Sequence, residues 1–258
     1  MSDDSPAQAP RANTPRADTP MADTPMADDT VGLLEGIAST RSIRRYRDEP
    51  VPADVLRDIC FAASRAPTGS NRQPFRLIVL TDGAVATEAK RLVADAAGRI
   101  WNHKRRNDGY DHGSGVDADS PKARMARSMD EHITGLDRAP ALVFPVLARF
   151  REPQATEGAS VYPAMQNLLL AARGRGYGGV VAMWHIPVEA ELRELLQIPD
   201  EAMIAATVTI GKPVGGHGPV RRRPLEHFVY DGVWGSTPAW AVDPPGTRHT
   251  SAGPPRPA

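Results

Sequence analysis

The chain has 258 residues, 41% of them hydrophobic and 24% charged, which is enough apolar material for at least one substantial core. Its formal net charge of zero excludes an overall electrostatic attraction to nucleic acid or to an anionic membrane. No apolar run approaches the ~18 residues that a membrane span requires, and a single cysteine, Cys60, favours a reducing, cytoplasmic location.

The 25 prolines are concentrated toward the two ends of the chain. Residues 1–29 contain the repeat Thr-Pro-x-Ala-Asp, whose period of five suits neither helix nor strand. This segment has too few apolar side chains to offset the entropy cost of ordering it. We therefore predict a disordered tail at 1–29, a second proline-rich tail at 235–258, and one folded domain at 30–234.

Between the tails, apolar spacing of three and four residues predicts helices. They are expected from Thr30 (with Thr30 or Asp29 as N-cap) to Ala38, after Pro52 to Ala63, and over Val85–Lys104, Pro121–Ile133, Ser160–Arg173 and Glu189–Leu196. Apolar runs predict strands over Arg76–Leu80, Ala141–Ala148, Val180–Ile186 and Met203–Ile210. Helices interspersed with four or five strands predict a mixed layer fold.

Two loops are longer than an ordinary connection. Pro67–Pro74 joins a predicted helix to a predicted strand through small and neutral polar residues, which suit close approach of a ligand or a plain structural connection. Residues 107–120 form a polar, glycine-containing loop that could serve as a lid.

Residues 174–179 satisfy G-x-G-x-x-G, the pattern of a dinucleotide-binding turn. That turn must leave a strand and open a helix, whereas here a helix precedes and a strand follows. We interpret the segment as a helix C-cap and tight return.

The histidines show no spacing typical of a metal site, and His103, His112 and His132 beside the 107–120 loop are expected at the surface. Two arginine clusters remain, at 41–47 and 221–223. Each is either solvated surface or an anion site, because guanidinium groups bind phosphate oxygens bidentately. The adjoining apolar residues favour a partly buried phosphate pocket over a free nucleic-acid arm.

Together these segments resemble the FMN-dependent nitroreductase family, which includes iodotyrosine deiodinases and flavin-cleaving enzymes. The resemblance spans Val31 to Trp234 and rests on five motifs in the family's order. They are Arg-Ser-Ile-Arg-Arg-Tyr at 41–46, Ala-Pro-Thr-Gly-Ser-Asn-Arg-Gln-Pro-Phe at 66–75, Gln-Asn-Leu-Leu-Leu-Ala-Ala at 166–172, Gly-Lys-Pro at 211–213 and Arg-Arg-Arg-Pro-Leu-Glu at 221–226.

The resemblance implies an α+β fold with a mainly antiparallel sheet, built as an interlocked homodimer with FMN at the interface. It implies phosphate and ribityl contacts from Arg41, Ser42 and Arg44, and a late phosphate contact from one of Arg221, Arg222 and Arg223. The residues that would line the flavin are Pro67, Thr68, Gly69 and Asn71, from the other subunit, and Gly179, Met183, Trp184 and His185.

This chain departs from the family pattern at two positions that concern the site. Thr40 stands where many members have a second arginine, so one ion pair to phosphate is missing or is supplied by Arg45. Thr68 replaces a common serine and keeps the hydroxyl.

The implied reaction passes a hydride from NADH or NADPH through FMN to a nitroaromatic or quinone in a ping-pong cycle, with no side chain acting as acid or base. Three alternatives stay open: a reductive dehalogenase or flavin-cleaving enzyme, whose specificity would come from residues 105–135 such as Tyr110, His112 and Lys122; a flavin-binding protein without turnover; and a scaffold that uses its dimer surface.

Overall fold

The computed structural model describes residues 31–250. The predicted tail at 1–29 and residues 251–258 of the second predicted tail lie outside this range, so the domain bounds stay predictions. Residues 235–250 are described; they form turns and one isolated bridge between Arg222 and His249. In the described part, no helix combines the length and apolar character needed to cross a membrane.

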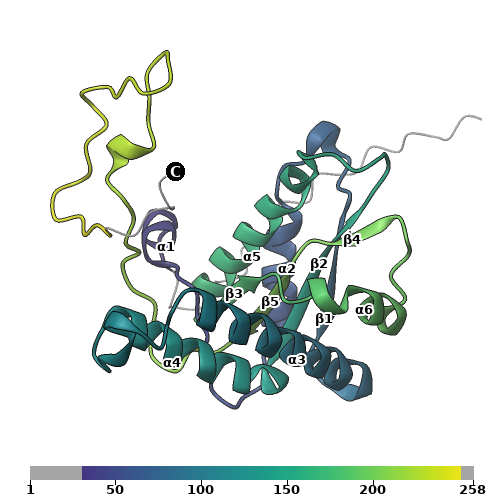
Figure 1. The fold of residues 1–258 in the computed structure, drawn as a ribbon. Helices are drawn as coiled ribbons and strands as arrows, with labels where there is room; N and C mark the ends of the chain where they lie inside the picture. The colour runs from purple at the N-terminus through teal and green to yellow at the C-terminus, as the bar shows by residue number, and fades with distance from the viewer. Residues whose placement is uncertain (1–30, 251–258) are drawn as a thin grey trace, which may run out of the picture.

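An antiparallel sheet of five strands lies between helices (Figure 1). The helices are α1 (Leu33–Ser39), α2 (Ala53–Ser64), α3 (Gly83–Asn107), α4 (Pro121–Thr134), α5 (Tyr162–Gly174) and α6 (Glu189–Leu196). The strands are β1 (Phe75–Leu80), β2 (Ala141–Ala148), β3 (Gly178–Ala182), β4 (Ala202–Ile204) and β5 (Thr207–Gly211). Their order is β1-β2-β5-β3, with β4 also paired to β2. The predicted α+β class is confirmed.

The central strand β2 divides the core into two layers, because successive side chains of a strand point to opposite faces. Val143 packs in a cluster with residues of α2 and α5, whereas Leu142 and Phe144 pack in a cluster with residues of α3 and α6. All three side chains are fully buried. The sheet is therefore covered on both faces, and any ligand site must lie at its ends or edges.

The predicted strand Met203–Ile210 is wrong in one respect, since the structure divides it into β4 and β5. Val143 pairs with Val208 but Val146 pairs with Ile204, so β2 advances three residues while its partner advances four. One extra residue on one strand is a β-bulge. It lies opposite Pro145, whose nitrogen cannot donate to the ladder, and the Ala205 amide donates to the Pro145 carbonyl at 2.8 Å.

Two other predicted bounds are corrected. Strand β3 ends at Ala182, not Ile186, because the chain turns at His185 and enters a short helical turn at Ile186–Val188 that contains a proline. Helix α1 starts at Leu33 with Gly32 as N-cap, three residues later than predicted, and the expected caps Thr30 and Asp29 lie outside the described residues. The predicted return after α5 is confirmed, with Gly176 at a φ of +76°.

The arginine segment, residues 41–47, runs along the end of the sheet and is bonded to it through its main chain. The Ile43 amide donates to the Gly179 carbonyl of β3 at 3.0 Å. On the other side, the Arg47 amide donates to Lys212 at 2.8 Å and the Val214 amide donates to Arg45 at 3.0 Å. The segment therefore bridges β3 and the chain that follows β5.

Tyr46 provides a side-chain anchor for the same segment. Its hydroxyl lies 2.7 Å from the Ile43 carbonyl, 3.2 Å from the Thr209 carbonyl and 2.8 Å from Thr209 Oγ1. Burial of this group raises the pKa of the Tyr46 phenol, so the hydroxyl stays protonated and can donate.

We expect Tyr46→Phe to lower the free energy of unfolding by about 1–3 kcal/mol, because buried acceptors lose their donor while ring packing is kept. Chemical denaturation measures this change. Tyr162→Phe is the matched control, since Tyr162 is 48% exposed, and it should leave stability unchanged. Equal stability of both variants would show that the hydroxyl does not anchor the segment.

Candidate functional site

Three of the predicted cofactor residues, Arg41, Ser42 and Arg44, meet in one cavity of about 350 Å³. Its wall is completed by Ile43, Arg45, Ser128 and the residues 214–216. Arg41 Nη2 donates to the Gly216 carbonyl at 3.0 Å, which holds the guanidinium at the cavity without neutralising it. Two glycines at 215 and 216 leave the main chain accessible there, as a bulky anion requires.

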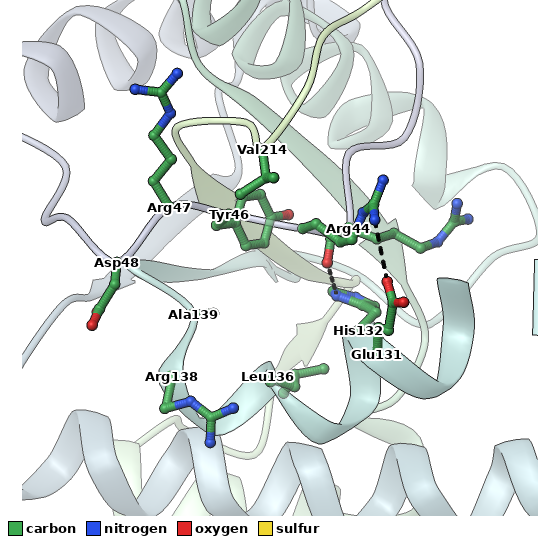
Figure 2. A pocket seen from close by; sticks show the side chains of 12 residues that line it. Arg44, Tyr46, Arg47, Asp48, Glu131, His132, Leu136, Arg138, Ala139 and Val214 are labelled. Atoms are coloured by element: carbon green, nitrogen blue, oxygen red, sulfur yellow. Dashed lines mark hydrogen bonds and ion pairs between the residues drawn. The ribbon is translucent and has the colours of Figure 1, made fainter. Parts of the chain in front are cut away.

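A second cavity of about 400 Å³ adjoins the first and shares Arg44, Arg45 and Val214 with it. Figure 2 shows Glu131 and His132 of α4 on the same side as Arg44, with Tyr46 and Val214 next to them. Both cavities lie between the arginine segment and α4, and we refer to the two together as the groove.

Arg44 and Arg45, which line both cavities, differ in whether a carboxylate lies next to the guanidinium. Arg45 pairs with Glu131 at 3.5 Å, and both side chains are more than half exposed, so the pair contributes little stability. Arg44 has no ion pair among the described residues, and its buried Nε atom has no hydrogen-bond partner there. Burial lowers the pKa of its guanidinium, but an arginine stays charged.

His132 is buried, which corrects the prediction that it lies at the surface. It is 2% exposed, and its Nδ1 lies 3.0 Å from the Arg44 carbonyl. Because a carbonyl only accepts, Nδ1 carries the proton. Burial lowers the pKa of His132 to about 4, so the ring is neutral and Nε2 is a lone-pair acceptor. The sequence did hold a signal: Ala126 and Met129 precede it at helical spacing on the buried side.

The residues predicted to run along the flavin lie beyond β3. Met183 is 41% exposed, but Trp184 and His185 are buried, at 8% and 3%. The Trp184 ring lies 5.0 Å from the ring of His132. The His185 ring lies 3.3 Å from Thr207 Oγ1, and burial lowers the pKa of this histidine as well. Of these three residues, only Met183 is exposed to a ligand in one subunit.

Gly179 joins the site through its main chain. Its carbonyl accepts from the Ile43 amide, and an added Cβ would lie 2.5 Å from the Thr209 carbonyl. Packing inside the sheet thus requires glycine here, whether or not a cofactor also does.

The predicted flavin-lining loop, with Pro67, Thr68, Gly69 and Asn71, lies at the opposite end of the sheet. Phe75 pairs with Leu147 near one end of β2, whereas Ala141 at the other end pairs with Ile210 of β5, two residues before Lys212, to which the arginine segment is hydrogen-bonded. Six residues of strand separate the two ends, roughly 20 Å at 3.3 Å per residue. One subunit therefore does not bring this loop to the arginines.

The loop itself has unusual backbone geometry. Ser70, Asn71 and Gln73 all have φ near +50°, a region that non-glycine residues rarely adopt. The Gln73 amide donates to Thr68 Oγ1 at 3.0 Å, which leaves the Thr68 hydroxyl proton available to another acceptor. Strained segments of this kind are found at ligand sites.

The late cluster, Arg221, Arg222 and Arg223, lies on the C-terminal arm, residues 221–250. Gly216, whose carbonyl accepts from Arg41, is the last residue of this stretch at the cavity. The chain then passes the end of α1, where the Val220 amide donates to the Ala38 carbonyl at 2.9 Å. Arg222 then bonds along the arm to Thr250. Figure 1 shows the arm (yellow) standing away from the sheet beyond α1. The structure places this cluster near α1 but not in the cavity.

The predicted lid is connected to the helices beside it. Arg105 binds Asp111 through three hydrogen bonds and reaches Asp130 at 2.6 Å. Tyr110 packs against Trp101 with ring centres 5.0 Å apart, and Lys122 Nζ lies 5.6 Å from the Tyr110 ring. Tyr110 and Lys122 thus contact each other and the helices, not the groove.

Several known proteins are similar to this chain in sequence or in fold. A Thermus thermophilus protein named NADH dehydrogenase is 31% identical over 195 residues, 73% of this chain and 90% of that one. The 4-nitrobenzoate reductase of Nocardioides sp. is 27% identical over 221 residues, 75% of this chain and 87% of that enzyme. The NADPH:FMN oxidoreductase of Vibrio harveyi, solved with NAD+, shares the fold with a TM-score of 0.57 at 20% identity, over 78% of this chain and 77% of that one.

The sequence profile of the nitroreductase family matches residues 37–212, which include the arginine segment, the polar loop and the whole sheet. This match covers more than half of the 258 residues and confirms the resemblance predicted from the motifs. The chain therefore belongs to the nitroreductase family.

Proposed function

We propose that this protein is an FMN-dependent oxidoreductase of the cytoplasm that uses NADH or NADPH to reduce a nitroaromatic compound or a quinone. The observation that carries the proposal is the cavity in which Arg41, Ser42 and Arg44 meet at the end of the sheet. The family match and relatives such as the 4-nitrobenzoate reductase support the choice of substrate class.

The residues present fit the phosphate end of FMN. Two guanidiniums without a carboxylate partner among the described residues, Arg41 and Arg44, face the cavity, and Ser42 offers a hydroxyl. The unpartnered Nε of Arg44 is a donor that a phosphate or ribityl oxygen would satisfy. The glycines at 215 and 216 leave room beside Arg41.

The chemistry that bound FMN supplies is two-electron transfer, from NAD(P)H in one half-reaction and to the acceptor in the other, which predicts ping-pong kinetics. The chain positions and charges the site. Arg41 and Arg44 favour negative charge in the groove. His132 and His185, whose pKa values burial lowers, are neutral near pH 7 and add no competing charge.

We propose that the second half of the site comes from a second copy of the chain. The strained loop at 67–74 and the arginine segment lie at opposite ends of one sheet, so a shared ligand needs two subunits. Exposed apolar side chains offer the surface for this homodimer. They are Leu33, Leu34 and Ile37 on α1, and Phe228, Val233, Trp234, Trp240 and Val242 on the arm. A surface of this kind is typical of subunit contacts.

Among the alternatives, a dehalogenase that clamps its substrate with the lid is not favoured by the contacts of Tyr110 and Lys122 with each other. Iodotyrosine deiodinase nevertheless shares the fold, at a TM-score of 0.56 and 20% identity over 74% of this chain and 95% of that one. The acceptor assay below includes its substrate class.

The double variant Arg41→Ala/Arg222→Ala should bind FMN at least about tenfold more weakly, because each charged contact contributes ~1.5–3 kcal/mol. Titration of the apoprotein followed by flavin fluorescence measures this change. Each single variant assigns the loss to the cavity or to the arm. Arg57→Ala is the matched control, since Arg57 lies exposed on α2 and binds Asp58. Wild-type affinity in the double variant would refute the phosphate assignment.

Subunit mixing tests the shared site. An Arg41→Ala subunit and an Asn71→Asp subunit should each bind FMN poorly as homodimers, the latter because an amide donor becomes a carboxylate. In a purified heterodimer with two different affinity tags, one site is intact and the other carries both changes. We expect FMN occupancy of about half the wild-type value. Occupancy no higher than in the homodimers would show that both segments serve the same subunit's site.

Anaerobic mixing with NADH or NADPH tests turnover. We expect bound flavin to bleach and then to regain its colour on addition of a nitroaromatic or a quinone, with parallel lines in double-reciprocal plots. Halophenols and enones are added separately as competing acceptors. A flavin that stays yellow would favour the binding-protein alternative, and reoxidation by halophenol alone would favour the dehalogenase.

A further inference from the structure

His132 occupies a junction between three segments of the groove. It lies in the last turn of α4, and its Nδ1 donates to the Arg44 carbonyl at 3.0 Å. Its ring lies 5.0 Å from that of Trp184 and 6.5 Å from that of Tyr46. Figure 2 shows the bond from His132 to the main chain of Arg44.

The contact with Arg44 completes a series of main-chain bonds. Ile43 is bonded to Gly179 of β3, and Arg45 to Val214 after β5. Between them, the Arg44 carbonyl accepts from α4 through His132. Ile43, Arg44 and Arg45 are thus hydrogen-bonded to β3, to α4 and to the chain after β5, respectively. His132 supplies the bond from α4.

We propose that His132 is a positioning residue of the FMN site, which sets the distance between the phosphate-binding arginines and the flavin-facing stretch at residues 183–185. This inference rests on the proposed function. Its Nδ1–H fixes the main chain of Arg44, and its ring packs against the ring of Trp184. The helix α4 would thereby hold in place both segments that are proposed to contact FMN.

A purely apolar role does not account for a histidine here. Nε2 is buried without a partner among the described residues, and a buried unsatisfied acceptor is unfavourable compared with a phenyl ring of similar shape. The unsatisfied Nε2 therefore destabilises the folded protein, and the hydrogen bond from Nδ1–H to the Arg44 carbonyl is the interaction that accounts for a histidine.

Three substitutions distinguish the roles of the two ring nitrogens. In His132→Asn the amide nitrogen takes the place of Nδ1, in His132→Gln it takes the place of Nε2, and His132→Phe keeps only the ring. We expect the Asn variant to retain FMN affinity within about threefold, whereas the Gln and Phe variants lose about tenfold, the value of one hydrogen bond. The absorption band of the bound flavin should shift in the latter two, while the Phe variant melts no lower than the Asn variant. His103→Gln, at an exposed site bonded to Asn107, is the control and should match wild type.

Wild-type affinity and spectrum in His132→Phe would overturn the inference, because packing alone would then suffice. Failure of the proposed function gives a different result, because the wild-type protein itself would then bind no FMN. Should the variants not fold, ¹⁵N NMR of wild-type holoprotein labelled at histidine gives a second test. A buried neutral His132 protonated at Nδ1 supports the inference, and one protonated at Nε2 overturns it.

Discussion

The site depends on the main-chain hydrogen bonds of the arginine segment. A run with Arg41, Arg44, Arg45 and Arg47 repels itself and would stay solvated if only side chains held it. Amides and carbonyls of residues 43–47 instead pair with β3 and with the chain after β5. Because the segment gains its order from the backbone, Arg41 and Arg44 need no carboxylate partner among the described residues, and their charges stay available to a ligand.

The second constraint is the covered sheet. Helices pack on both faces, so ligands are confined to the ends of the strands, and β2 keeps these two ends about six residues apart. A polar loop with three left-handed residues at one end and a cationic cavity at the other each look like half of a site. The proposed two-fold dimer would join them, and the exposed apolar side chains of α1 and the arm are candidates for its contact surface.

Local patterns predicted much of the fold. β2 and α6 have the predicted bounds because a long apolar run and a strong helical period are local signals. The break between β4 and β5 was missed, since it depends on Pro145 in another strand. His132 was misplaced because residue type alone favours the surface, although its helical spacing from Ala126 and Met129 already puts it on the buried side of α4. Which groups it contacts there, Arg44 and Trp184, depends on how α4 docks. The motifs marked the arginine segment and the loop as candidate parts of a site, and only the register of β2 shows how far apart they lie in one subunit.

The positive charge that the cavity can offer to a phosphate depends on which of its arginines have no carboxylate partner. The sequence left open whether Arg45 replaces the arginine that many members have at the position of Thr40, but Arg45 is paired with the carboxylate of Glu131. Arg41 donates to a carbonyl, which keeps its full charge. His217, beside Arg41, adds none, because burial and the nearby Arg173 and Arg41 charges lower its pKa and favour the neutral ring. In one subunit the cavity thus offers two unneutralised charges, Arg41 and Arg44, about as many as a phosphate monoester carries near neutral pH. This balance explains how the site tolerates Thr40, whose hydroxyl is buried without a partner among the described residues.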